Sequence, residues 1–394
     1  MTRTVTRRLI VLLLVGAAVI GARLVWRGAM APVGGGMSAP SGSNDGASGA
    51  GETGRVGWRL EVPGSVGALA GDDELTVTIS ANSVVTALDP GSGSPLWAHE
   101  LGDLGTDRPA LSGDRLALRG RQRAIVLDRA DGSLLWEAAI AGPGPVVWSG
   151  ASVDGSASGA VVAGSWDGTL AAFEPDEGSH RWSVQRPGAV RSVPVGIPPA
   201  MAGGEHLVVV VSHGERSATI AALRVTDGEV VWERELGAAS SAPAVGSVDS
   251  SAGVVVGDGR GGILALDPEH GHPLWTATVG AGFTPDVAPV VDDEQVFVAD
   301  RLGVVHALAA SDGERLWSHD LGVPVLRGSP TVTRDQIVVT TTDGRAAALD
   351  RTDGGLVDVS DADTFVVATA YGGGHLVTGL RLSGPGMVEG VAIP

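Results

Sequence analysis

From Val56 onward, short apolar runs alternate with turn-forming residues. Residues 207–211 read Leu-Val-Val-Val-Val and residues 336–340 read Gln-Ile-Val-Val-Thr, and both are rich in β-branched side chains. No segment after residue 55 keeps a helical period over ten residues. The pattern therefore predicts an all-β fold built from many short strands.

An eleven-residue motif recurs seven times within this pattern. Its first residue is small and apolar, its third is usually a carboxylate, its seventh is Gly, and its eleventh is Trp in six copies. The seventh copy carries Asp358 at the Trp position. The copies begin at Ala87, Val126, Ala172, Ala222, Ala265, Ala307 and Ala348.

The motif predicts a strand, a tight turn and a second strand. In the fifth copy, residues 268–271 form the turn, and Gly271 can adopt the positive φ of a type I turn followed by a glycine bulge. Upstream of the motif, Gly-containing stretches such as 166–168 and 258–262 predict another hairpin. Each repeat unit is therefore expected to hold four antiparallel strands.

The spacing of the Trp residues gives the repeat period. Starting from Trp58, which precedes the first full motif, the steps are 39, 39, 46, 50, 43 and 42 residues, and then 41 to Asp358. Four-stranded units of this length in series are typical of a β-propeller. The longer third and fourth steps indicate loop insertions near 152–158 and 197–205.

The two ends of the array predict how the ring closes. After the seventh unit, residues 364–368, 375–380 and 387–393 supply three strands without a motif, and residues 56–62 supply a lone strand at the start. Joining them gives an eighth blade that leaves no open sheet edge in the ring. The alternative is seven blades followed by a loose tail.

The repeated Trp is expected to pack between adjacent blades, because a packing position recurs in every unit whereas a binding site breaks the symmetry. Asp358 then predicts a weaker joint after the seventh unit. The residues expected in this structural role are Trp58, Trp97, Trp136, Trp182, Trp232, Trp275 and Trp317.

The first 54 residues differ in composition from the repeat array. A basic end, 1–8, precedes an apolar stretch, 9–26, whose length suits a short transmembrane signal anchor with the cytoplasmic end first. A cleaved signal peptide is the alternative, which would release a secreted protein. Residues 27–54 are rich in Gly, Ala and Ser, as in a flexible linker, and the propeller follows at 55–394 on the extracytoplasmic side.

Composition narrows the possible functions. The net charge of −18 argues against nucleic-acid binding, because an acidic body repels a phosphate backbone. Cys is absent, which excludes disulfides, a Cys nucleophile and a thiolate metal site. The nine His are scattered, and the closest pair, His270 and His272, falls in a predicted turn. We therefore expect no catalytic site, no cofactor and no metal.

One set of residues breaks the repeat symmetry. Several units begin their innermost strand with Pro, and the residue three positions earlier varies in charge. The side chains there could form a polar pocket at one mouth of the central channel, or merely line a water-filled channel. The set comprises Arg191, Ser240, Asp286 and Arg327.

Over residues 55–394, the pattern Ala-x-Asp-x-x-x-Gly-x-x-x-Trp resembles the pyrrolo-quinoline-quinone-type propeller repeat family. It is most similar to the non-catalytic branch typified by the propeller lipoprotein of the outer-membrane barrel-assembly machine. That resemblance implies a protein-binding scaffold. The alcohol-oxidising enzymes of the family hold the quinone against a vicinal Cys pair, which this chain lacks.

We therefore expect a membrane-anchored scaffold that binds a protein partner in cell-envelope assembly or signalling. A carbohydrate- or cell-wall-binding module is the first alternative. Exposed aromatic residues would support it, and the candidates are Trp148, Trp166, Phe283 and Tyr371. A quinone-dependent dehydrogenase is the second alternative.

Overall fold

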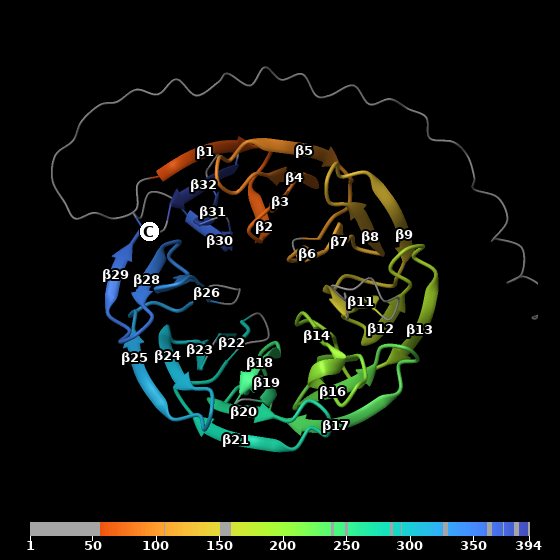
Figure 1. Ribbon diagram of the computed structural model, residues 1–394, viewed down its shortest axis with the longest axis vertical. Coiled ribbons are helices and arrows are strands. Elements are labelled where there is room, and N and C mark those ends of the chain that lie inside the picture. The colour runs from red at the N-terminus through yellow and green to blue at the C-terminus, as the bar shows by residue number, and fades with distance from the viewer. Residues whose placement is uncertain are drawn as a thin grey trace, which may run out of the picture. The chain divides into compact units, whose positions relative to one another are not determined.

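The chain forms a closed ring of eight four-stranded antiparallel sheets around a central axis (Figure 1). This computed structural model describes residues 56–105, 107–149, 159–237, 240–248, 251–283, 287–292, 294–325, 330–360, 365–372, 374–381 and 386–392. The prediction of an eight-bladed propeller is confirmed, and the alternative of seven blades with a loose tail is wrong.

The first four blades follow the chain order, each from its innermost to its outermost strand. Blade one holds β2 (Val66–Gly71), β3 (Thr76–Ser80), β4 (Val84–Leu88) and β5 (Pro95–Glu100). Blade two holds β6 (Ala110–Ser112), β7 (Arg115–Arg119), β8 (Arg123–Asp128) and β9 (Leu134–Ala139). Blade three holds β10 (Val146–Ser149), β11 (Ala160–Gly164), β12 (Thr169–Phe173) and β13 (His180–Gln185). Blade four holds β14 (Val195–Ile197), β15 (Leu207–His213), β16 (Ala218–Arg224) and β17 (Val230–Leu236), with the short 3-10 helix η1 (Pro199–Met201) after β14.

The next three blades repeat the same order. Blade five holds β18 (Ala244–Val248), β19 (Ser251–Gly257), β20 (Gly262–Leu266) and β21 (Pro273–Thr278). Blade six holds β22 (Val290–Asp292), β23 (Gln295–Ala299), β24 (Val304–Ala309) and β25 (Arg315–Asp320). Blade seven holds β26 (Thr331–Val332), β27 (Gln336–Thr340), β28 (Ala346–Asp350) and β29 (Leu356–Val359).

Blade eight is assembled from both ends of the array. Its three inner strands are β30 (Phe365–Gly372), β31 (His375–Arg381) and β32 (Gly386–Ala392), and its outermost strand is β1 (Val56–Val62). β1 pairs with β32 in antiparallel register, with Trp58 opposite Gly390. The ring is therefore closed by backbone hydrogen bonds between its first strand and its last.

The motif forms the turn between the third and fourth strands of a blade. In blade one, the amide of Gly93 donates to the carbonyl of Asp89 at 2.8 Å, and Gly93 has φ +67°. The strand register shifts between Ala87 and Leu88, as expected for a glycine bulge. The same register shift follows the first motif residue in all seven copies.

Each motif Trp reaches the turn of the following blade. The Trp136 indole nitrogen donates to the carbonyl of Pro175 at 2.8 Å, and a Cβ added to Gly178 would lie 2.4 Å from the indole. The carbonyl belongs to position four of the next motif and the Gly to position seven. The same geometry joins Trp58 to Gly93, Trp97 to Gly132, Trp182 to Gly228, Trp232 to Gly271, Trp275 to Gly313, and Trp317 to Gly354.

The apolar core lies between blades. Eight clusters of buried residues occur in the described chain, and each joins two neighbouring blades. Seven of them include a motif Trp, either buried or, for Trp58, packed against the cluster. The cluster between blades seven and eight has none and is built from Val338, Ala346, Val366, Leu376 and Leu380.

Asp358 stands at the joint that lacks a Trp. It lies on β29, where every residue is exposed, whereas the outer strand β25 buries Trp317. The following blade is made of the two ends of the array, so no continuous motif turn joins β32 to β1. A Trp at this position would lack the complete turn that receives the other seven.

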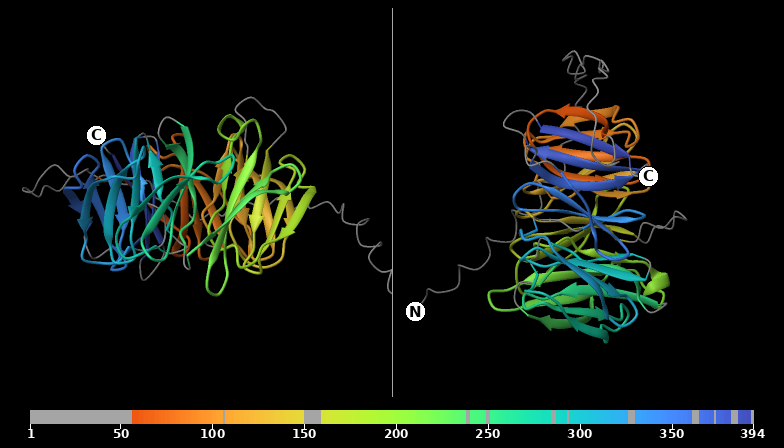
Figure 2. Two further views of the ribbon diagram at one scale, coloured as in Figure 1. Left: turned by 90° about the horizontal axis from the view of Figure 1, so that it is seen from below. Right: turned by 90° about the vertical axis from the view of Figure 1, so that its left-hand side faces the viewer.

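The innermost strands form a continuous ring in which each strand contacts both neighbours. All residues of β6, β22 and β26 are partly exposed, although the adjacent strands are mostly buried. Solvent therefore reaches the inner wall of the ring. The propeller seen edge-on is a thick disc whose loops gather at its two faces (Figure 2).

The N-terminal predictions fall outside the described residues. The basic end at 1–8, the expected span at 9–26 and the linker at 27–54 are not described. In the part of the chain that is described, no helix has the length and apolar character needed to cross a membrane.

We predict that Gly178→Ala destabilises the protein more than Gly113→Ala. Both glycines have positive φ, at +66° and +53°, which costs an L-residue about 1–2 kcal/mol. A Cβ at Gly113 meets nothing within 4 Å, whereas one at Gly178 would displace the indole of Trp136. Urea unfolding should show that the free energy of unfolding falls by about 1 kcal/mol in Gly113→Ala and by about 3 kcal/mol or more in Gly178→Ala. The larger decrease approaches that caused by loss of a buried aromatic side chain. Equal losses would contradict the Trp–Gly contact.

We also predict that the joint after blade seven opens more readily than the other joints. Hydrogen exchange followed by mass spectrometry should show β29 exchanging faster than β25, because β29 has no buried Trp to hold it. The two strands occupy the same place in adjacent blades, so β25 is the internal control. Slower exchange in β29 than in β25 would contradict the prediction.

Candidate interaction face

The two faces of the disc carry different loops. One face holds the connections from the outermost strand of a blade to the innermost strand of the next, together with the hairpins between second and third strands. We call it the connector face. The opposite face holds the motif turns, and we call it the motif face.

The connection between blades three and four is held from both sides. The amide of Val190 donates to the carbonyl of Ser165 in the hairpin of blade three at 2.9 Å. Ala189 pairs with His213 of blade four through two backbone hydrogen bonds. The Ser192 hydroxyl lies 3.1 Å from the His213 Nε2. Residues 189–192 are thereby fixed at the connector face.

Arg191 projects from this fixed segment. Its guanidinium carbon lies 5.7 Å from the centre of the Trp166 ring, a cation–π arrangement. Arg191 is exposed, and Trp166, in the hairpin of blade three, is 55% exposed. Trp and Arg are the side chains most enriched at the energetic centres of protein interfaces. This pair therefore has the composition of an interface anchor on the connector face.

The other predicted channel-mouth residues behave differently. Ser240 is fully buried, and its hydroxyl donates to the carbonyl of Gly237 at 2.9 Å, so it presents no polar group to solvent. Asp286 and Arg327 lie outside the described residues. Among the described residues, no contact brings Arg191 and Ser240 together.

Of the four aromatic residues considered as sugar platforms, Trp166 alone is largely exposed. Phe283 is 3% exposed and belongs to the core between blades five and six. The Trp148 indole nitrogen donates to the carbonyl of Ala110 at 2.9 Å. Trp148 and Tyr371 are both partly buried. The expectation that Phe283 offers an exposed ring is therefore wrong.

Sequence reasoning missed two arginines of blade two. Arg119 is buried and donates to the carbonyls of Gly120, Arg123 and Gly142, at 2.8, 2.9 and 2.6 Å. Burial lowers the pKa of its guanidinium to about 10. Arg108 is exposed and directly precedes the buried Pro109. Pro109 is in register with the other strand-opening prolines, but the residue three positions before it is Thr106, so the spacing does not point to Arg108.

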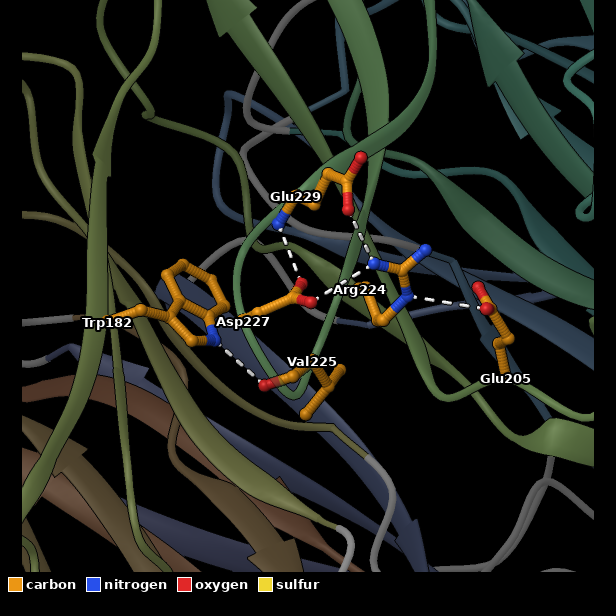
Figure 3. A network of polar contacts seen from close by, with 6 residues as sticks. All are labelled: Trp182, Glu205, Arg224, Val225, Asp227 and Glu229. Carbon is orange, nitrogen blue, oxygen red and sulfur yellow. Dashed lines mark hydrogen bonds and ion pairs between the residues drawn. The ribbon is translucent and has the colours of Figure 1, made fainter.

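The motif face is rich in carboxylates, and several of its arginines are paired with them. Arg224 replaces the usual carboxylate at position three of the motif and contacts Glu205, Asp227 and Glu229 (Figure 3). Hydrogen bonds to Glu229 and Asp227 raise the pKa of Arg224. Ion pairs also hold four further motif-face arginines, Arg115, Arg129, Arg181 and Arg351.

The described residues offer no metal centre. No group of three or more His, Asp or Glu side chains is placed to hold an ion among them. His270 and His272 stack with ring centres 5.8 Å apart, and both are exposed. Their placement fits the predicted solvated turn.

Comparison with known proteins identifies the family. A family model described as outer membrane protein assembly factor BamB matches residues 21–144, 81–260 and 259–362. These matches span most of the repeat array.

The chain belongs to this family.

Curated relatives carry the same description. A BamB of Moranella endobia is 25% identical over 318 residues, which is 75% of this chain and 77% of the relative. A BamB of Burkholderia pseudomallei is 24% identical over 314 residues, which is 74% and 79% of the two chains. The predicted resemblance to the quinone-type propeller family, in its barrel-assembly branch, is confirmed.

Solved structures agree on the fold. BamB from Moraxella catarrhalis superposes with a TM-score of 0.64 at 16% identity, covering 85% of this chain and 97% of the other. Quinohemoprotein alcohol dehydrogenase from Comamonas testosteroni also gives 0.64, at 14% identity, covering 85% and 76%. At these identities the likeness shows the propeller fold alone, and it does not separate scaffold from enzyme.

A buried His–Asp pair in blade six predicts a pH dependence of stability. His306 Nε2 lies 3.7 Å from the Asp300 carboxylate, and both residues are almost fully buried. Asp300 also accepts hydrogen bonds from the amides of Ala281, Leu302 and Val304. Burial lowers the pKa of His306, opposed by Asp300 and assisted by Arg315.

Because the folded protein disfavours protonated His306, the unfolded chain binds this proton first as the pH falls below about 6.5. We predict that stability is lost between pH 7 and pH 5, and that His306→Leu reduces this loss. Urea unfolding at both pH values measures it. His272→Gln, at an exposed imidazole, is the control. An unchanged pH dependence in His306→Leu would exclude this residue as the cause.

Proposed function

We propose that this propeller is a non-catalytic scaffold that binds a protein partner in the cell envelope through its connector face. The observation that carries the proposal is the exposed Trp166 with Arg191 beside it, on a segment fixed by neighbouring hairpins. A rigid, exposed Trp–Arg pair is typical of an interface anchor, because little side-chain entropy is lost on binding.

The names of the relatives support a role in the envelope. They are named outer membrane protein assembly factors. A partner involved in envelope assembly is therefore our first expectation, and signalling is the alternative. Channel-mouth residues Asp286 and Arg327 lie on equivalent connections in the sequence, and we include them with Arg191 in the proposed contact surface.

We further propose that residues 9–26 anchor the protein in a membrane, with residues 27–54 as a linker and the propeller from residue 55 on the extracytoplasmic side. The apolar stretch and its basic flank support this arrangement, and the lack of Cys removes the acceptor for an N-terminal acyl anchor. A secreted propeller is the outcome if the segment is cleaved.

A non-catalytic role is supported by what the described residues bring together. Ser192 and His213 lie within hydrogen-bonding distance, but Ser192 is 3% exposed, so its hydroxyl is not open to a substrate. The enzyme alternative can be tested by adding the quinone and Ca²⁺ to the protein. A chromophore that stays bound to the protein would favour a quinone-dependent dehydrogenase.

Crosslinking in intact cells tests the scaffold proposal. We predict that the wild-type full-length chain captures a protein partner in the membrane fraction. Trp166→Ala combined with Arg191→Ala should reduce that capture at least about tenfold, because losing an anchor worth about 2 kcal/mol weakens binding by about thirtyfold. Mass spectrometry of the crosslinked material gives both the partner and the yield.

Leu96→Ala is the matched control, because Leu96 is as exposed as Trp166 but lies on the outer strand β5 of blade one. Its capture yield should equal that of the wild type. Equal yields from all variants would exclude the Trp166–Arg191 surface. Retention of the protein by polysaccharide, lost in Trp166→Ala, would instead favour the carbohydrate-binding alternative.

A further inference from the structure

The joint between blades seven and eight differs from the other joints at its outer corner. At those seven joints a Trp indole lies between the blades and packs against the glycine turn of the following blade. Here Asp358 takes the place of the Trp, and β32 and β1 come from opposite ends of the array, so no motif turn joins them. The corner where β29 meets blade eight therefore lacks both the indole and the turn that covers it elsewhere (Figure 1).

The wall that blade seven presents to this corner is open to solvent. Ala348, the first residue of the seventh motif, pairs directly with Asp358 on β29. In the six other copies the first motif residue pairs with the Trp and is fully buried. Ala348, in contrast, is partly exposed, because the exposed Asp358 does not cover it as an indole would. The six buried residues are Ala87, Val126, Ala172, Ala222, Ala265 and Ala307.

The facing wall in blade eight is open at the same level. Val391 pairs with Leu376, so the two side chains share one face of the sheet, and Leu376 belongs to the apolar cluster against which Ala348 packs. Val391 corresponds to the second motif residue, because the preceding Gly390 pairs with Trp58. The second residue is at most 2% exposed in all seven motif copies, whereas Val391 is partly exposed.

These two walls define an apolar notch between the blades near the motif face. We call it the seventh-joint notch, and its residues are Ala348, Asp358, Leu376 and Val391. Its walls are of the same kind as those that hold an indole elsewhere: a small first motif residue faces an aliphatic side chain of the next blade. Because no turn crosses this corner of blade eight, a side chain from another molecule can enter from the motif face.

The rim of the notch is acidic. Asp358 is exposed opposite Ala348, and the motif turn that leads into β29 also carries Asp350 and Asp353. The arginine of that turn, Arg351, is paired with Asp292 of blade six. Apolar walls below an acidic rim favour a side chain that buries a large apolar surface and stands beside a positive charge.

We propose that the seventh-joint notch binds an aromatic side chain with a basic neighbour, both carried on a segment of a partner protein. The aromatic ring lies against Ala348 and Val391, where the motif indole lies at the other joints, and the basic side chain meets Asp358. The notch opens toward the motif face, whereas Trp166 and Arg191 lie on the connector face. The propeller thereby has a second docking position that does not depend on the proposed scaffold contact.

Saturation-transfer NMR of the full-length protein in detergent tests the notch with three end-capped peptides, Gly-Trp-Lys-Gly, Gly-Trp-Glu-Gly and Gly-Ala-Lys-Gly. Wild-type protein should bind the Trp-Lys peptide in the millimolar range, and about threefold more tightly than the Trp-Glu peptide, because the lysine faces an acidic rim. The Ala-Lys peptide should not bind, since it brings no ring to fill the notch.

Two substitutions separate the apolar and the charged parts of the notch. Ala348→Leu places a larger side chain where the ring lies, and it should weaken binding of the Trp-Lys peptide at least about tenfold. Asp358→Asn should leave both Trp peptides bound but reduce the preference for the Lys peptide over the Glu peptide, because the exposed charge is removed.

Ala98→Leu is the matched control for Ala348→Leu, because Ala98 is an exposed alanine on the outermost strand β5 of blade one. Its affinity for the Trp-Lys peptide should equal the wild-type value. Trp166→Ala combined with Arg191→Ala should also bind the peptide as the wild type does, which separates the notch from the connector-face contact. Thermal unfolding of each variant checks that the fold is retained.

The proposal is overturned if wild-type protein does not bind the Trp-Lys peptide at millimolar concentration, or if Ala348→Leu binds it no more weakly than Ala98→Leu. Sedimentation of the wild type and Ala348→Leu tests a second copy of the chain as the occupant. Self-association that is lost in Ala348→Leu would assign the notch to that second copy and overturn its assignment to a different protein.

Discussion

The contact on which the propeller most depends is the one between a Trp indole and the glycine turn of the next blade. The indole supplies a large apolar surface, and its nitrogen satisfies a backbone carbonyl that the turn leaves free. Gly is required at the turn for two independent reasons: its backbone has positive φ, and a Cβ would occupy the space of the ring. One eleven-residue motif thus shapes a blade at its turn and joins the blade to its neighbour at its end.

This dependence explains the exception at Asp358. A Trp gains its full stabilisation only against an intact turn, and the eighth blade is the one in which the chain is interrupted at that place. The cluster between blades seven and eight relies instead on aliphatic residues such as Val366 and Leu380. The loss of the Trp and the split of the closing blade are therefore two aspects of one geometric constraint.

The strands and the closure were predictable from the sequence because the motif marks equivalent positions in every unit, and Trp58 fixed the register of the lone first strand. The candidate interaction site was harder to predict from the sequence. Equivalent spacing before a proline placed Arg191 and Ser240 on similar connections, but the burial of Ser240 depends on a local hydrogen bond that spacing does not encode. Burial and exposure are tertiary properties.

The closing blade also determines where force would enter the molecule. Any tension transmitted through the residues that precede Val56 acts first on β1, the outermost strand of blade eight. β1 is held to its own blade by hydrogen bonds to β32 and to blade one by the Trp58 indole, which donates to Pro90 at 3.0 Å. A pull along the strand would load these bonds together, whereas a pull away from the disc would break them one after another. The Trp58 contact therefore helps to keep the ring closed under tension, and the direction of the force determines how well these contacts resist it.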